Sequence, residues 1–434
     1  MDKMADVLGR AGAWCGQNKY LSAIKNAFQN FMPLTIAGAI GVLWCNVLVN
    51  ESTGLGIFFK PIMALEFLNP AFQAVNFCTI SCITVGITLG IAQEIGIWNM
   101  GAEKAGYIPG LVGLAAWLSV TNTSHMVEGA KEAFTGIAGN ELGATGLFTG
   151  MIIGVLSVEL FCFFEKQDAL KIKMPEQVPP GVARAFEVLV PATITLIITA
   201  CIGSACYNLT GLYLNDVIKN GIQGPLGAVG ATIPGVMIIY LVIMLFWLVG
   251  IHGNNMLSAV KEALFTPLAL ENVEAFNKGE TPKNIINMYF LQMCGEFGGS
   301  GVTIGLVIAI MIFGKREDNK AIASLSLVPG LFNINETVTF GIPMVLNPIL
   351  GIPFVFACLV TILVGYVLTV IGFCPVACLT VPWTTPPIVF GFLACGANVM
   401  GAVTQAILIV VSTVIYVPFL IAYEKYQNKQ AAEA

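Results

Sequence analysis

Long stretches of apolar residues without formal charge dominate the chain. Counting histidine as neutral, these stretches cover residues 26–50, 67–93, 105–127, 142–158, 188–215, 220–260, 297–314 and 337–423. One helical crossing of a bilayer takes about 20 apolar residues, so 337–423 could hold about four crossings and 220–260 about two. The short alternating segments of a transmembrane barrel are absent. The pattern predicts an all-α polytopic membrane protein with about ten transmembrane helices in a lipid bilayer.

Charged residues are few and unevenly distributed. They make up 10% of the 434 residues, whereas 56% are hydrophobic; a typical soluble domain has about 25% charged residues. Basic residues gather at the N-terminus, in 165–184, in 314–320 and in the C-terminal tail. Because short cytoplasmic loops are enriched in Lys and Arg, we expect all four segments, and hence both termini, in the cytoplasm. The net charge of −5 gives no reason to expect a nucleic-acid partner.

A polar loop with several prolines divides the chain at residues 165–185. Linkers between packed units combine prolines and charges in this way. We expect an N-terminal helical half in 1–165, which serves as a scaffold, and a cytoplasmic linker in 166–190. A C-terminal helical half in 191–423 should carry the binding site, followed by a cytoplasmic tail in 424–434.

The C-terminal half repeatedly places amides, His, Glu, Trp and Pro inside apolar runs. Helices break at membrane depth only where the freed backbone is buried in protein or lines a cavity. We therefore interpret 251–270 and 321–350 as re-entrant or broken-helix segments rather than continuous crossings.

Glu336 is the one formal charge between Lys320 and Glu424. A charged side chain at the centre of a membrane helix costs about 2.5–3.5 kcal/mol on insertion scales. Intramembrane ionisable groups are candidates for function, so we expect Glu336 to act in substrate binding and catalysis. The alternative is a structural carboxylate that forms a hydrogen bond to a neighbouring helix.

Amides and helix-breaking residues surround this carboxylate. Asn333 and Asn335 precede it, whereas Gly341 and Pro343 follow it and should end the helix. A carboxylate among amides on a broken helix suits hydrogen bonding to sugar hydroxyls. We therefore include Asn335 among the expected sugar-binding residues.

His252 lies where another apolar run is interrupted, in WLVGIHGNNM (247–256), between Gly250 and Gly253. Because glycines and amides break the run around it, we expect His252 and Asn254 to bind substrate and His252 also to act in catalysis. The alternative is a core histidine with satisfied hydrogen bonds. The chain has only two histidines, and no Cys or Asp cluster lies nearby in the sequence, so a metal site is not expected.

Trp383 stands among three prolines in TVPWTTPPIV (380–389). A tryptophan in such a non-helical segment can stack on the apolar face of a sugar whose hydroxyls pair with amides and carboxylates. The alternative is a tryptophan at the membrane interface. Weaker candidates for sugar binding are Gln223, Trp247, Asn76 and Glu296.

The twelve cysteines are scattered, mostly inside apolar runs. Cys78 and Cys82, like Cys374 and Cys378, are four residues apart, but a metal site needs further ligands and usually a tighter pair. We interpret them as small buried hydrophobic residues and expect no disulfide, metal or other cofactor. No GxxxxGKS/T loop is present, so no sign of ATP hydrolysis by this chain is found.

Three motifs in this order, GIHG, NETVTFGIPMVLNP and VPWTTPP, carry a family resemblance. The chain resembles the membrane (IIC) component of the bacterial phosphoenolpyruvate-dependent sugar phosphotransferase system, in the lactose/cellobiose/diacetylchitobiose branch, over essentially its whole length. The resemblance implies ten spans, two re-entrant hairpins and a homodimer built through the N-terminal half. It also implies that a β-linked disaccharide is carried inward and phosphorylated on its inner side, usually at the C6 hydroxyl.

The phosphoryl donor in this family is a cysteine of a IIB protein, with IIA upstream. We expect no IIB domain in this chain, so the donor would be a separate protein and this chain the sugar-translocating subunit of the phosphotransferase. Glu336 could accept the hydroxyl proton, and His252 could orient the hydroxyl or share that role. The family usually has Asn-Glu-Pro here, and Thr337 in place of the proline leaves the rigidity of the loop and the sugar preference open.

Two other function classes are compatible with the same residues to different degrees. A proton-coupled secondary sugar transporter would use Glu336 as its proton carrier and accumulate unmodified sugar. A membrane-embedded hydrolase would need a nucleophile, a base and an orienting group in one cavity, and no such set stands out. Cellobiose, lactose, chitobiose and other β-linked disaccharides are all open as substrates.

Overall fold

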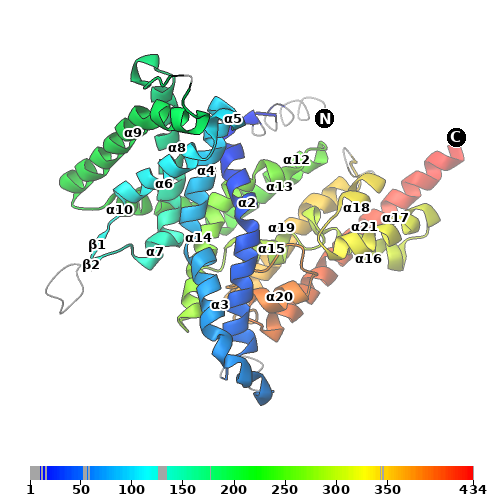
Figure 1. Ribbon diagram of the computed structural model, residues 1–434. Coiled ribbons are helices and arrows are strands. Elements are labelled where there is room, and N and C mark those ends of the chain that lie inside the picture. The colour runs from blue at the N-terminus through cyan, green and yellow to red at the C-terminus, as the bar shows by residue number, and fades with distance from the viewer. Residues whose placement is uncertain are drawn as a thin grey trace. The chain divides into compact units, whose positions relative to one another are not determined.

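The computed structural model of the chain is built almost entirely of helices (Figure 1). It describes residues 10, 13–14, 17–51, 56, 59–125, 134–175, 177–342, 344 and 347–433. The strands found in this part of the chain, β1 (Ser124–His125) and β2 (Phe134–Thr135), pair antiparallel as a small hairpin. Pro343, expected from the sequence to help end the helix after Glu336, lies outside the described residues.

The chain forms two compact units. Unit 1 comprises Met1–Gly16, Ala39–Gln73 and Ala228–Ala434, and unit 2 comprises Gln17–Gly38 and Ala74–Gly227. These boundaries are a property of packing and differ from the functional division expected from the sequence, a scaffold in 1–165 and a binding half in 191–423. That functional division stays a prediction.

Unit 2 has its core where α4, α6 and α8 pack together, with α9 against α6 and α8. Ala116, Trp117 and Val120 of α6 form a buried cluster with Ile153 of α8. The described elements of this unit, including those that cross its boundaries, are α2 (Lys19–Leu43), α3 (Asn69–Asn76), η4 (Phe77–Ser81), α4 (Ile83–Met100), α5 (Ala102–Ala105), α6 (Ile108–Val120), α7 (Gly139–Leu142), α8 (Ala144–Glu165), η5 (Asp168–Leu170), α9 (Pro180–Thr210), α10 (Leu214–Ile218), η6 (Lys219–Gln223) and α11 (Gly224–Gly230).

Unit 1 is organised around α19 and α21, which pack against each other and against α12, α15, α16 and α20. Short helices alternate with long ones here because glycines and prolines interrupt the apolar runs. The described elements of this unit are η1 (Trp44–Leu48), η3 (Lys60–Leu68), α12 (Ile233–Leu248), α13 (Gly253–Met256), α14 (Ser258–Asn277), α15 (Met288–Gly295), η7 (Ser300–Val302), α16 (Ile304–Phe313), α17 (Glu317–Leu331), α18 (Glu336–Gly341), α19 (Gly351–Val370), α20 (Val389–Ala394) and α21 (Val399–Glu433).

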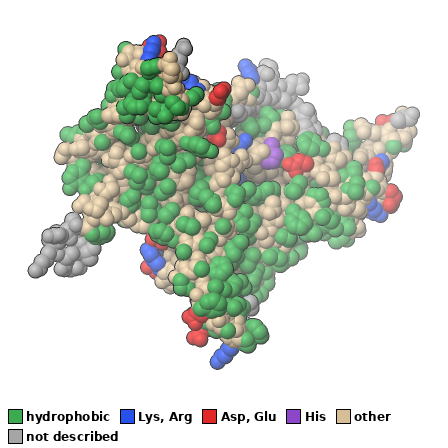
Figure 2. Space-filling model, in the orientation of Figure 1, with side chains coloured by type: hydrophobic (Ala, Val, Ile, Leu, Met, Phe, Trp, Pro, Cys, Tyr) green, Lys and Arg blue, Asp and Glu red, His purple; other side chains and the backbone are tan. Residues whose placement is uncertain are grey.

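Several helices are long and apolar enough to cross a membrane. In the described residues there are five, or up to seven if two pairs bent by 42° and 59° each count as one span, and α12 and α6 are shorter apolar helices. Much of the visible surface carries hydrophobic side chains, with charged groups in a few places (Figure 2). These features confirm the predicted all-α polytopic membrane protein, and the number of helices is close to the ten expected.

Both segments that the sequence marked as broken do contain breaks. Helix α12 ends at Leu248, and the chain turns through 249–252 before α13. From Ser258 the helix is continuous, so in 251–270 the break is confined to the beginning. In 321–350 the chain forms a helical hairpin, because α17 ends at Leu331 and the short α18 begins at Glu336.

A close contact between two helices of unit 1 tests this packing. A Cβ on Gly305 of α16 would overlap the Oγ of Ser412 and lie 2.8 Å from the backbone nitrogen of Thr413 on α21. We expect Gly305→Ala to lower the free energy of unfolding by about 1–3 kcal/mol, because overpacking forces backbone shifts. Thermal unfolding in detergent measures the effect.

Gly181→Ala is the matched control, since no atom lies within 4 Å of a Cβ at that position of α9. Alanine favours an exposed helix over glycine by up to about 1 kcal/mol, so this variant should unfold at the same or a slightly higher temperature. Equal melting temperatures for Gly305→Ala and the wild type would contradict the close contact of α16 with α21.

Candidate functional site

His252 and Glu336, singled out separately from the sequence, lie side by side in the structure. The imidazole Nε2 is 3.9 Å from Oε1 of Glu336, and the two side chains are 37% and 48% exposed. Figure 2 shows a histidine next to acidic side chains on a mostly apolar face. A histidine and a carboxylate that are both accessible can act together on a hydroxyl group.

The backbone determines which nitrogen of His252 carries the hydrogen. His252 caps the N-terminus of α13, where its Nδ1 accepts the N–H of Asn255 at 3.2 Å. A neutral imidazole has one donor and one acceptor nitrogen. Nε2 is therefore the donor, and it points to the side on which Glu336 lies.

Glycine allows the sharp turn that presents His252. A Cβ on Gly253 would overlap the carbonyl oxygen of Ile243, so only glycine lets α13 start this close to α12. Trp247 packs behind the imidazole with ring centroids 4.5 Å apart. Trp247 is only 2% exposed, so it forms a wall of the site, and its buried Nε1 has no partner among the described residues.

Asn333 joins three non-helical segments in front of Glu336. It has a positive φ of 62°, a conformation that asparagine tolerates better than most residues. Its Oδ1 accepts the N–H of Gly298 at 2.7 Å. Its Nδ2 donates to the carbonyl oxygens of Trp383 and Thr385. One amide therefore fixes the loop before α18 to the loop after α15 and to the proline-rich segment around Trp383.

Ser300 is a second junction of broken segments. Its Oγ accepts a 3.0 Å hydrogen bond from Asn254, and its carbonyl oxygen accepts one of 2.8 Å from Asn335. Asn335 is 4% exposed and holds the loop together, so a contact of Asn335 with sugar stays a prediction. The Oδ1 of Asn254 is buried without a partner among the described residues, which leaves an acceptor for a ligand hydroxyl.

Trp383 is positioned as an exposed ring on a fixed backbone. Its side chain is 44% exposed, whereas its carbonyl oxygen is held by Asn333. This arrangement fits a stacking platform, because the ring is available while the chain that carries it is tied down.

Glu296 lies at the C-terminal end of α15 and is paired with groups that the sequence reading missed. Its Oε1 accepts a 2.7 Å hydrogen bond from the Tyr240 hydroxyl and forms an ion pair with Lys261. The missed signal was Lys261 itself, a lysine that directly follows the long uncharged run 220–260.

Two of the weaker candidates belong to unit 2. Gln223 ends η6, is 8% exposed, and has a buried Oε1 without a partner among the described residues. Asn76 ends α3, and its Oδ1 is buried and similarly unpaired within the described chain. That these two residues bind the same sugar as Glu336 stays a prediction.

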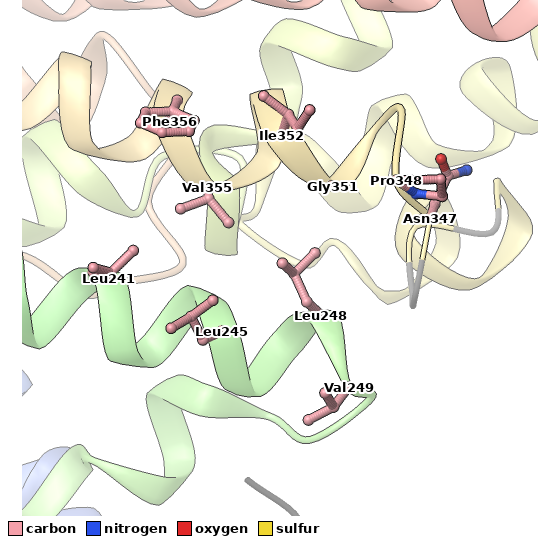
Figure 3. Close-up of a pocket in the computed structure, with 10 residues that line it drawn as sticks. All are labelled: Leu241, Leu245, Leu248, Val249, Asn347, Pro348, Gly351, Ile352, Val355 and Phe356. Atoms are coloured by element: carbon pink, nitrogen blue, oxygen red, sulfur yellow. The ribbon is translucent and has the colours of Figure 1, made fainter. Parts of the chain in front are cut away.

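A pocket of about 280 Å³ between α12 and α19 has a different chemistry (Figure 3). Leu241, Leu245 and Leu248 of α12 face Ile352 and Val355 of α19 across it. The lining is almost entirely apolar and offers few groups to a sugar, so the polar cluster around His252 is the better candidate site. In the described part of the chain, no group of three or more His, Cys, Asp or Glu side chains could hold a metal ion.

Comparisons with known proteins place the chain in one family. Residues 25–358 match the family described as Phosphotransferase system, EIIC. The chain is 33% identical to the oligo-beta-mannoside-specific EIIC component of Bacillus subtilis, over 98% of this chain and 94% of that protein. It is 29% identical to the cellobiose-specific EIIC component of Lactococcus lactis, over 98% of each.

One relative is longer, and one solved structure is similar throughout. The lactose-specific EIICB component of Streptococcus mutans is 27% identical over 96% of this chain but only 71% of its own length. The crystal structure of ChbC, the IIC component of the N,N'-diacetylchitobiose-specific phosphotransferase system, matches with a TM-score of 0.88. It is 29% identical and covers 97% of both chains.

The junction at Asn333 yields a test of how the site is held. Asn333→Ala would leave the N–H of Gly298 and the carbonyl oxygens of Trp383 and Thr385 without their partner. A typical hydrogen bond contributes about 0.5–1.5 kcal/mol to stability, so local opening should become easier. Hydrogen exchange followed by mass spectrometry should show faster exchange in 296–303 and 380–388.

Asn208→Ala is the control, because this asparagine is exposed on α9. It should leave exchange in both segments unchanged. If Asn333→Ala also leaves both segments unchanged, Asn333 does not hold the three loops together.

Proposed function

The chain belongs to the phosphotransferase system EIIC family, and we propose that it is the sugar permease subunit for a β-linked disaccharide. It would bind the sugar, carry it inward and present a hydroxyl, which we assign to C6, to the phosphocysteine of a separate IIB protein. The substrate class is supported by relatives named for cellobiose, oligo-beta-mannosides, lactose and N,N'-diacetylchitobiose. Which of these sugars it takes is left to a binding panel.

The pairing of His252 with Glu336 carries the proposal. A hydroxyl oxygen can lie about 2.8 Å from each of two atoms that are 3.9 Å apart, which is ordinary hydrogen-bonding distance. The hydroxyl would donate to Glu336 and accept from Nε2–H of His252. Glu336 would then take the proton as general base, while His252 orients the attacking oxygen.

Phosphoryl transfer relies mainly on positioning and charge stabilisation, with little covalent chemistry for the protein to perform. The loops around the pair supply this positioning, since Asn333 and Ser300 tie them together. The unpaired Oδ1 of Asn254 and the Nε1 of Trp247 would bind further hydroxyls, and the exposed Trp383 ring would stack on the sugar.

Thr337 is compatible with this role. It is the second residue of α18, in the first turn, where backbone N–H groups have no acceptor inside the helix. Proline and threonine are therefore both accommodated there. The substitution keeps Glu336 at the start of the helix.

The proposal includes the orientation of the chain in the membrane and its oligomeric state. The clusters of basic residues support cytoplasmic termini and cytoplasmic 165–184 and 314–320 segments. Phosphorylation inside the cell requires the phosphoryl donor to reach the sugar from that face. We further propose a homodimer through the N-terminal half and rigid-body alternating access, both carried over from the family.

Glu336→Gln separates the catalytic from the structural role of the carboxylate. The variant is nearly isosteric but removes the base and the charge. Because general base catalysis contributes about 10²–10⁴-fold, we expect phosphoryl transfer from phosphorylated IIB to labelled cellobiose to fall by that factor. Cellobiose binding, measured by calorimetry, should survive at reduced affinity.

Glu317→Gln provides the control, because that side chain is 86% exposed at the start of α17. It should leave transfer and binding unchanged. A folded Glu336→Gln protein that phosphorylates sugar at the normal rate would leave only a structural role for Glu336.

A further inference from the structure

A second carboxylate next to the site is neutralised by a buried lysine. Lys261 of α14 is 6% exposed and forms an ion pair with Oε1 of Glu296. The Tyr240 hydroxyl donates to the same oxygen at 2.7 Å, and the Lys261 ammonium lies 5.5 Å from the centroid of the Tyr240 ring. Three helices therefore contribute to one ion cluster.

The surroundings of this cluster are apolar. Tyr240, Phe297 and Ile362 are each at most 1% exposed, and a Cβ on Gly295 would press against Tyr240 and Ile362. Desolvating a charge costs several kcal/mol unless it is paired and hydrogen-bonded. The lysine is thus the group that makes an ionised Glu296 tolerable at this position.

The two oxygens of Glu296 are used unequally. Both Lys261 and Tyr240 bond to Oε1, and no hydrogen bond to Oε2 is found within the described part of the chain. The Glu296 side chain is 18% exposed, so it is not sealed off. Oε2 is therefore available to accept a hydrogen bond from a ligand.

Three other titratable groups lie near the cluster. His252 and Cys358 lie close enough to interact electrostatically with Glu296. Glu262, next to Lys261, is hydrogen-bonded to the Thr266 hydroxyl. His252 in turn faces Glu336, so the cluster is continuous with the candidate site.

We propose that Lys261 is a positioning residue whose fixed positive charge keeps Glu296 ionised and aimed at the sugar, so that Glu296 binds sugar without binding a proton. The inference rests on the proposed sugar-binding function. An ionised Glu296 accepts a hydrogen bond through Oε2, whereas a carboxyl group protonated at Oε2 would offer that oxygen chiefly as a donor. Lys261 thereby excludes proton coupling at Glu296, which is more buried than Glu336.

Removing the lysine should expose this role. In Lys261→Met the carboxylate loses its counter-charge in apolar surroundings, where burial favours the neutral acid. If the sugar binds the ionised form, binding must then release a proton, and affinity must rise with pH. In the wild type no such step is needed, so its pH profile is the reference with which the variant is compared.

The test is calorimetric sugar binding between about pH 5.5 and 8.5, a range in which buried carboxyl groups of proteins are known to change protonation state. Cellobiose, lactose and N,N'-diacetylchitobiose are tried on the full-length wild type, and the one bound most tightly is the probe. We expect Lys261→Met to lose at least about tenfold more affinity than the wild type as the pH falls, equivalent to about 1.4 kcal/mol. Buffers of different ionisation enthalpy should reveal proton release on binding.

Three further variants make the outcome specific. Lys261→Arg should keep the wild-type profile, since it retains the charge. The double variant Lys261→Met with Glu296→Gln should bind more weakly but lose the added pH dependence, because neither charge remains. Lys278→Met is the control, because Lys278 is exposed just after α14 and pairs with Glu274; its profile should match the wild type.

A Lys261→Met protein with the wild-type pH profile would overturn the inference. So would a double variant whose binding depends on pH as strongly as that of Lys261→Met. If Lys261→Met does not fold, the double variant is compared with the wild type instead. A stronger pH dependence of its sugar affinity than in the wild type would contradict the role of Glu296. Failure of the wild type to bind any of the three sugars would instead refute the proposed function.

Discussion

Where a helix breaks at membrane depth, the backbone N–H and C=O groups that it frees must find partners inside the protein. In unit 1 asparagine side chains meet this requirement. Asn333 pairs with backbone groups of two other segments, and Asn254 and Asn335 meet at Ser300. The same bonds hold loops that are distant in sequence in one arrangement. The exposed chemistry of His252, Glu336 and Trp383 depends on that arrangement.

The carboxylates of Glu296 and Glu336 have opposite surroundings. Glu296 is largely buried and bonded to Lys261 and Tyr240 through one oxygen. Glu336 is about half exposed and faces an imidazole whose Nε2 is the donor. A charge locked by a counter-ion suits binding, whereas a charge beside a neutral donor can take up a proton during a reaction. Under the proposed function, binding and proton transfer would be divided between these two residues.

The sequence predicted the features that depend on local composition. Long uncharged runs revealed the helices, and the lone charge of Glu336 and the glycines around His252 revealed the breaks. The sequence did not predict contacts between residues that are far apart in the chain. Lys261 directly follows a long uncharged run, but only the structure shows that it pairs with Glu296. Only the packed structure shows which amides the backbone already uses, as with Asn335, whose Nδ2 bonds to Ser300. Its expected contact with sugar stays a prediction.

The central claim is that Glu336 and His252 serve phosphoryl transfer rather than proton-driven transport, and vesicle uptake tests it most directly. Labelled cellobiose is added outside vesicles that contain the purified chain. One sample has a proton gradient alone, and the other has phosphorylated IIB on the cytoplasmic face. We expect the gradient alone to concentrate no sugar, and phosphorylated IIB to trap the sugar inside as its phosphate. Concentration of free sugar under the proton gradient without IIB would contradict the account.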